Sequence, residues 1–243
     1  MDLAGEGAGA GRTFVLVHGA WHGGWCWRRV ADILQQRGHK VFAPTLTGLA
    51  DRSHLLTAAV NLDTHIADIV NLVKWENLGD VVLVAHSYAG FPVSGAIEQI
   101  SDRVASVVFL DAFMPENGQR SLDVASEFSK NLTAEAMAKG ELANAAPPAE
   151  RFAVNERDRA WVDSKLTPQP LGVGSQPVRL TGARERVPKK TYIRAPRYPQ
   201  PHFDKYYLAK KADPSWRTYQ VPCGHDVMID MPERLAEILL EVA

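Results

Sequence analysis

A serine lies at the end of an apolar run, with small residues around it. Residues 80–95 read DVVLVAHSYAGFPVSG, and Ala85 and Ala89 flank Ser87 at two positions on either side. A serine hydroxyl becomes an effective nucleophile only where a base takes its proton and donors stabilise the resulting oxyanion. The nucleophile elbow, a sharp strand-to-helix turn with the pattern G-x-S-x-G, exposes such a hydroxyl. Alanine at both glycine positions weakens the match, and a serine that only caps the following helix is the alternative.

Two further stretches supply the other parts of such a site. His225 lies in PCGHDVMIDMPERL, between the last expected strand and the last expected helix. That is where the base falls in the chain order serine, acid, histidine. The run LVHGAWHGGW ends the first strand in a His-Gly pair, and its loop can offer the Ala20 N–H to an oxyanion. We therefore predict Ser87 as nucleophile and His225 as base, with the Ala20 and Tyr88 N–H groups as the oxyanion hole.

Alternating strands and helices must position these residues. Apolar, β-branched runs predict strands at 13–19, 40–48, 80–87, 103–113, 189–195 and 216–222. Helical periodicity predicts helices at 27–39, 61–79, 88–100, 201–212 and 231–242. Continuous apolar strands between helices are typical of an α/β fold with a mostly parallel, doubly wound sheet covered on both faces. Ligands bind beyond the carboxyl ends of such strands, where Ser87 and Asp111 both fall.

The pattern loosens after the strand that ends at Asp111. Residues 114–188 are rich in proline and hold only short helical pieces, which predicts a small cap inserted over the strand ends. Residues 13–113 and 189–243 then form the core. Residues 1–12 are glycine-rich, with neither the basic nor the apolar region of a signal peptide, and are expected to be a disordered leader.

Composition narrows the class of protein. The 243 residues carry 27 basic and 28 acidic side chains, so no basic surface supports a nucleic-acid partner. No apolar run reaches the length of a membrane span, so no membrane partner is expected. Two cysteines without metal-ligand spacing predict no disulfide framework, no metal, and a reducing, cytoplasmic location. No cofactor is expected, and a homodimer is one open expectation.

Three motifs together resemble a known family. FVLVHGAWHGGWCWRRVADILQQRGHKV, VLVAHSYAG and GHDVMIDMPERLAEILLEV are similar to the α/β-hydrolase fold. More narrowly, they resemble the plant methylesterases, the hydroxynitrile lyases and their bacterial esterase relatives, the carbendazim-hydrolysing type included. The likeness covers the chain outside the leader and most of the cap.

The resemblance has one departure, at the acid that orients the histidine. In the plant enzymes this acid follows the strand matching TYIRAPRY, where this chain has Tyr198. Asp111 ends the strand after the nucleophile strand, which resembles the haloalkane dehalogenases whose acid has moved there. A carboxylate closing an apolar strand is costly to bury without a partner. We therefore predict Asp111 as the acid. Asp204, inside the helix expected at 201–212, is the alternative acid. A non-catalytic interpretation also remains, in which Asp111 only caps the first turn of the cap.

The function expected is that of a serine esterase acting on a small, largely apolar ester. A methyl ester or methyl carbamate of an aromatic compound suits a capped pocket lined by Trp21, His22 and Trp161. Two alternatives remain. Hydroxynitrile cleavage would use the same Ser87 and His225 but needs a cationic residue, typically Lys, which VPCGHDV lacks. The second alternative is a ligand-binding protein that has lost turnover. It remains possible as an interpretation because the usual acid position is occupied by Tyr198.

Overall fold

The apolar runs form one parallel sheet. The computed structural model describes residues 11–243; residues 1–10, most of the expected leader, lie outside them. Six strands lie in the order β2-β1-β3-β4-β7-β8, and every neighbouring pair is parallel. Their bounds are β1 Thr13–Val17, β2 Lys40–Phe42, β3 Val81–His86, β4 Val104–Leu110, β7 Lys189–Arg194 and β8 Arg217–Gln220. The predicted α/β fold class is confirmed.

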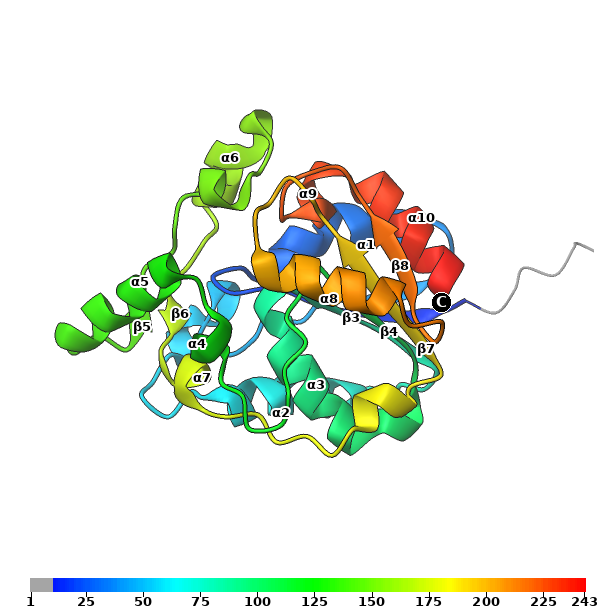
Figure 1. Ribbon diagram of the computed structural model, residues 1–243, viewed down its shortest axis with the longest axis horizontal. Helices are drawn as coiled ribbons and strands as arrows, with labels where there is room; N and C mark the ends of the chain where they lie inside the picture. Colours follow the sequence, from blue (N-terminus) through cyan, green and yellow to red (C-terminus); the bar gives the residue numbers. More distant parts are fainter. Residues whose placement is uncertain (1–10) are drawn as a thin grey trace, which may run out of the picture.

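Helices cover both faces of the sheet (Figure 1). On one face lie α1 Arg28–Gln36, α9 Val227–Asp230 and α10 Pro232–Val242, and on the other lie α2 Leu62–Trp75, α3 Gly90–Ile100 and α8 Pro201–Lys211. Alternate strand residues serve the two layers: Val15, Leu83 and Phe109 pack with α2 and α3, whereas Leu16, Val84 and Val108 pack with α1 and α10. This two-residue period is the side-chain alternation of a strand, and burial on both faces explains the continuous apolar runs.

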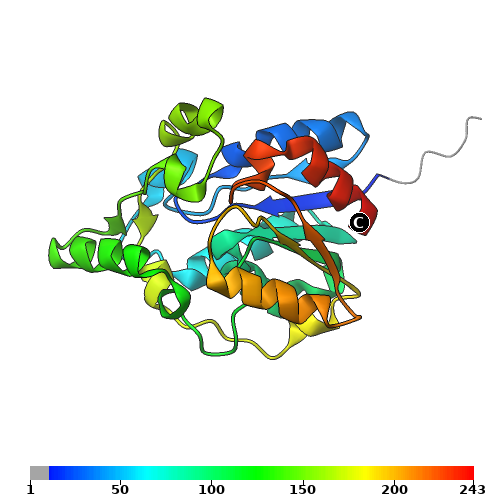
Figure 2. The same cartoon turned by 45° about the horizontal axis from the view of Figure 1, so that its top comes forward.

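The cap is built from short elements at one end of the sheet. Figure 2 shows α5 and α6 there, with the C-terminus at the opposite end. The segment contains α4 Ser121–Val124, α5 Glu127–Ala138, β5 Ala143–Asn144, α6 Glu156–Asp163, β6 Gln169–Pro170 and α7 Gly172–Ser175, with β5 and β6 paired antiparallel. Its last part differs from the prediction. Ala183 and Val187 pack into the core, and Glu98 of α3 accepts the Thr181 and Ala183 N–H groups.

Short 3-10 helices complete the described chain at Gly24–Trp27, Ala50–Leu55, Ser87–Ala89, Ser101–Arg103, Ala149–Phe152 and Ala183–Arg186. Several expected elements are shorter than the patterns suggested. The strand predicted at 40–48 ends at Phe42, and the helix predicted at 27–39 ends at Gln36 before Gly38, whose φ is 82°. Loops follow the carboxyl ends of β1 and β4, whereas β3 continues through the turn Ser87–Ala89 straight into α3.

Gly90, the first residue of α3 after the turn Ser87–Ala89, gives the first prediction. A Cβ at Gly90 would lie 1.8 Å from the Phe113 carbonyl oxygen, so backbone would have to move. Gly90→Ala should lower the free energy of unfolding by roughly 3 kcal/mol, a typical cost of overpacking a tight site. Urea denaturation measures the change. Gly79→Ala is the control, because nothing lies within 4 Å of its Cβ position; equal effects in the two variants would contradict the packing argument.

Candidate active site

Ser87 occupies a sharp turn directly after β3. Its φ is 54°, in the left-handed region that non-glycine residues seldom adopt, and the 3-10 turn Ser87–Ala89 leads straight into α3. The Ser87 carbonyl accepts the Phe113 N–H at 3.1 Å, which ties the turn to the end of β4. Such strain is found where the surroundings enforce it, often at functional sites. Ala85 and Ala89 are fully buried and fit; the glycine that this turn needs is Gly90.

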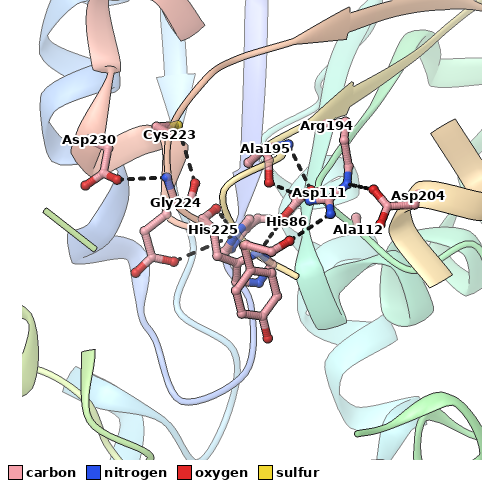
Figure 3. A network of polar contacts seen from close by, with 12 residues as sticks. His86, Asp111, Ala112, Arg194, Ala195, Asp204, Cys223, Gly224, His225 and Asp230 are labelled. Atoms are coloured by element: carbon pink, nitrogen blue, oxygen red, sulfur yellow. Dashed lines mark hydrogen bonds and ion pairs between the residues drawn. The ribbon is translucent and has the colours of Figure 1, made fainter. Parts of the chain in front are cut away.

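His225 is held by Asp111 (Figure 3). The His225 Nδ1 lies 2.7 Å from Asp111 Oδ2, and the two side chains are 3% and 0% exposed. The His225 N–H also donates to the Phe152 carbonyl at 2.8 Å. Because a carboxylate can only accept, Nδ1 carries the proton and Nε2 is the basic nitrogen. Ser87 and His225 line the same cavity, so the structure brings the predicted nucleophile, base and acid together.

A buried arginine compensates the charge of Asp111. Arg194 Nη1 donates to Asp111 Oδ1 at 2.7 Å, and the Ala195 N–H donates to the same oxygen at 3.0 Å. Arg194 Nε then donates to Asp204 at 2.8 Å, where the carboxylate is 58% exposed. Asp204 thus contacts the arginine, while Asp111 contacts the histidine (Figure 3). The two candidate acids belong to one chain of alternating charges.

Aromatic rings enclose the histidine. Tyr198 stacks on the His225 ring with centroids 4.3 Å apart, and Phe203 and Phe152 lie nearly parallel to it at 5.6 and 6.1 Å. Burial raises the pKa of Tyr198 to about 12, so its phenol is neutral over the ordinary pH range. The tyrosine at the position of the plant acid therefore supplies a ring face in place of a charge.

His86 also lies against the His225 ring. Its ring centroid is 4.5 Å from that of His225, and its Nε2 is 3.1 Å from the His225 carbonyl oxygen. Burial, followed by the nearby His225, lowers the pKa of His86 well below 6.5. His86 is therefore neutral and donates to this carbonyl, which holds the His225 backbone in place.

His22 and Asp226 form a buried pair beneath the site. His22 Nε2 lies 3.1 Å from Asp226 Oδ2, and the side chains are 1% and 0% exposed. Burial opposes both charges, but mutual attraction outweighs it: the pKa of His22 is raised, and that of Asp226 is lowered to about 2. One expectation is corrected here. His22 lies outside the cavity lining because its side chain points to Asp226.

The cavity lies between the strand ends and the cap. Its walls include the predicted oxyanion residues Ala20 and Tyr88, together with Trp21. The Ala20 N–H makes no hydrogen bond within residues 11–243, so it is available to a ligand. The prediction for Trp161 is wrong: it packs edge-on against Trp25 and beneath Arg29, away from the cavity. Aromatic rings also come from Phe113, Phe152, Tyr198 and Phe203.

The described residues contain no group of three or more His, Cys, Asp or Glu side chains able to hold a metal ion. Within the same residues, no helix is both long and apolar enough to cross a membrane. A separate depression next to α1 is lined by Trp25, Asp32 and Lys165, and it contains none of the residues predicted for the catalytic site, the oxyanion hole or the substrate pocket.

A model described as the alpha/beta hydrolase family matches residues 14–238. The chain belongs to this family. A carbendazim hydrolyzing esterase from Nocardioides sp. is 41% identical over 239 residues, which cover 93% of this chain and 98% of that protein. Methylesterase 2 from Arabidopsis thaliana is 34% identical over 131 residues, covering 53% and 50%. The resemblance predicted from the motifs is confirmed, and this alpha/beta hydrolase is an ester hydrolase.

Solved structures show the same fold. An extracellular alpha/beta-hydrolase from a Paenibacillus species superposes with a TM-score of 0.84 at 22% identity, covering 96% of this chain and 99% of that one. Tomato methylketone synthase I, solved with 2-tridecanone, gives 0.78 at 20% identity, covering 96% and 97%. At these identities the likeness establishes the architecture of this hydrolase and not its substrate.

Sequence reasoning missed three polar residues of the site. Arg194 ends a strand that begins with two lysines, so it was indistinguishable from the solvated end of an edge strand. Asn144 and Gln169 lie in the irregular cap, where no periodicity indicates which side chains turn inward. A signal for Arg194 did exist: a second buried charge is the usual compensation for a buried aspartate.

Replacement of each candidate acid by asparagine gives the second prediction. Asp111→Asn should reduce kcat about ten-thousandfold, because the amide disrupts the proton placement on His225. Asp204→Asn should keep kcat within about tenfold, since this carboxylate is half exposed and acts only through Arg194. Steady-state kinetics on one ester compares them, with thermal unfolding as the check on folding. A near-full rate in Asp111→Asn beside a large loss in Asp204→Asn would overturn the assignment.

The buried pair below the site gives the third prediction. Asp226→Asn should lower the free energy of unfolding by roughly 3 kcal/mol near pH 6, because a buried charge loses its partner. The contribution of His22 to the free energy of unfolding is complete below its unfolded pKa of 6.5, and it is lost as pH rises through the raised pKa of the folded state. That of Asp226 is complete above 3.8 and is lost as pH falls toward 2.

The stability difference between wild type and Asp226→Asn should therefore be largest between about pH 4 and 6.5 and shrink on both sides. Urea denaturation across this range measures it. Asp230→Asn is the matched control, because the partners of Asp230 among residues 11–243 are the uncharged amides of Asn155 and Gly224. A difference for Asp226→Asn that does not change with pH would contradict the ion pair.

Proposed function

We propose that this hydrolase is a cofactor-independent serine esterase that forms an acyl-enzyme on Ser87. The observation that carries the proposal is the 2.7 Å contact between His225 Nδ1 and Asp111 Oδ2, beside a cavity that Ser87 also lines. This contact leaves Nε2 as the free base, on the ring that borders the cavity. A strained serine, an oriented imidazole and an unpaired amide at Ala20 are the parts that acyl transfer requires.

The chemistry follows from these parts. Ser87 Oγ attacks the ester carbonyl while His225 Nε2 takes its proton. The Ala20 and Tyr88 N–H groups donate to the oxyanion, and Asp111 stabilises the imidazolium. Collapse breaks the bond to the leaving alcohol, which receives the proton from Nε2. Water, deprotonated by the same nitrogen, then releases the acid and restores Ser87.

Aromatic walls favour a small, largely apolar ester, and a methyl ester or methyl carbamate of an aromatic compound fits them. Phe113 and Trp21, which are only partly buried in the cavity lining, offer ring surface against which a flat ring can stack. The carbendazim hydrolyzing esterase and Methylesterase 2, to which the chain is similar, carry names that agree with this substrate class.

Cyanide release from a hydroxynitrile has less support. That reaction needs a cation near the leaving group, and no lysine or arginine belongs to the cavity lining among residues 11–243. A binding protein without turnover has less support too, because Asp111 orients His225 and no residue of the described chain hydrogen-bonds its Nε2.

Active-site substitution gives the fourth prediction. Wild type should hydrolyse aryl and methyl esters and react with a fluorophosphonate probe, whereas Ser87→Ala and His225→Ala should lose at least a thousandfold in kcat. Absorbance assays and mass spectrometry of the labelled protein measure the two properties. Wild type that neither turns over nor labels would eliminate the hydrolase mechanism, and cleavage of mandelonitrile in place of esters would favour the lyase.

A further inference from the structure

One glutamine of the cap has a buried donor with no partner. Gln169 lies in β6, is 5% exposed, and lines the same cavity as Ser87 and His225. Its Nε2 is buried and makes no hydrogen bond to any described residue. Six other residues of the described chain hold an unpaired buried polar atom, and none of them lines this cavity. An unmet buried donor is costly, which points to a ligand that completes it.

The orientation of this amide is fixed by its neighbours. Gln169 Oε1 accepts the Trp21 N–H at 2.9 Å, and a reversed amide would set two donors against each other. Trp21 itself has a φ of 63°. Its indole N–H donates to Asn144 Oδ1 at 2.8 Å, and its carbonyl accepts the Thr167 N–H. Asn144 Nδ2 is in turn occupied by Thr133. The Gln169 Nε2 is the donor of this polar cluster that stays free.

We propose that Gln169 Nε2 donates a hydrogen bond to the substrate, so that the site selects esters carrying a second acceptor near the scissile carbonyl. Trp21 directly follows Ala20, so chain geometry places Nε2 within about 9 Å of the Ala20 N–H. A ring nitrogen, ether oxygen or carbonyl oxygen a few bonds from the ester carbon reaches that donor while the ester carbonyl occupies the oxyanion hole. This inference rests on the proposed esterase function and adds a chemical feature to its substrate.

Matched substrates test this selection. Methyl picolinate, nicotinate and isonicotinate share the shape of methyl benzoate and differ in whether and where they carry a ring nitrogen. Each kcat/KM is divided by the hydroxide rate of the same ester, which removes intrinsic reactivity. In wild type, at least one isomer should exceed methyl benzoate by about tenfold, the worth of one hydrogen bond in a buried site. Gln169→Met should remove this advantage, even if it lowers all rates through Trp21.

Two further variants control the result. Gln176→Met makes the same change in the cap outside the cavity lining and should keep the advantage. Gln169→Glu retains an acceptor for the Trp21 N–H but, when ionised, offers no donor, so it should also lose the advantage. This variant replaces Gln169→Met in the test if the methionine variant fails to fold. Equal normalised rates for all four esters in wild type, or an advantage that persists in Gln169→Met, would overturn the proposal.

Binding separates this proposal from the esterase mechanism. Calorimetry of the same four esters with Ser87→Ala compares their affinities without turnover. Turnover in wild type without any preference in rate or affinity overturns the role of Gln169 alone. A preference in affinity that Gln169 controls, beside a wild type with no turnover, overturns the esterase mechanism and retains the donor.

Discussion

The buried carboxylate of Asp111 is the constraint on which the site depends. A fully buried charge is tolerated only when hydrogen bonds and an opposite charge replace the lost water. Both oxygens of this carboxylate accept hydrogen bonds, Oδ1 from Arg194 and the Ala195 N–H and Oδ2 from His225. Compensation of the buried charge therefore holds all three groups in place. Asp111 thus orients the His225 ring, fixes which of its nitrogens carries the proton, and couples β4 to β7.

The parallel sheet makes this arrangement possible. Ser87, Asp111 and Arg194 stand at or just beyond the ends of the adjacent strands β3, β4 and β7, so residues far apart in sequence meet at one edge. Ser87 and Asp111 both have positive φ, at 54° and 42°, which turns the chain sharply there. The cap completes the site from the other side, because Asn144 and Gln169 hold Trp21 beside Ala20.

The sequence predicted the parts of the site that depend on local motifs. Ser87 and His225 lie in strand-loop patterns that specify their surroundings within a few residues, and the cost of burying Asp111 pointed to a partner. Trp161 and His22 were misassigned because their environment depends on contacts between distant segments: Arg29 covers the first and Asp226 binds the second. Arg194 and Gln169 escaped notice for the same reason, since a single polar residue in a strand or an irregular cap carries no periodicity that reveals its burial.

The central claim is that Ser87, His225 and Asp111 act as one unit in ester hydrolysis. Non-additivity of substitutions tests it most directly, through kcat measured for Ser87→Ala, Asp111→Asn and the double variant on one activated ester. If the residues form a unit, Asp111→Asn should cost orders of magnitude in the wild-type background and almost nothing once Ser87 is alanine. An undiminished loss from Asp111→Asn in the Ser87→Ala background would contradict the account.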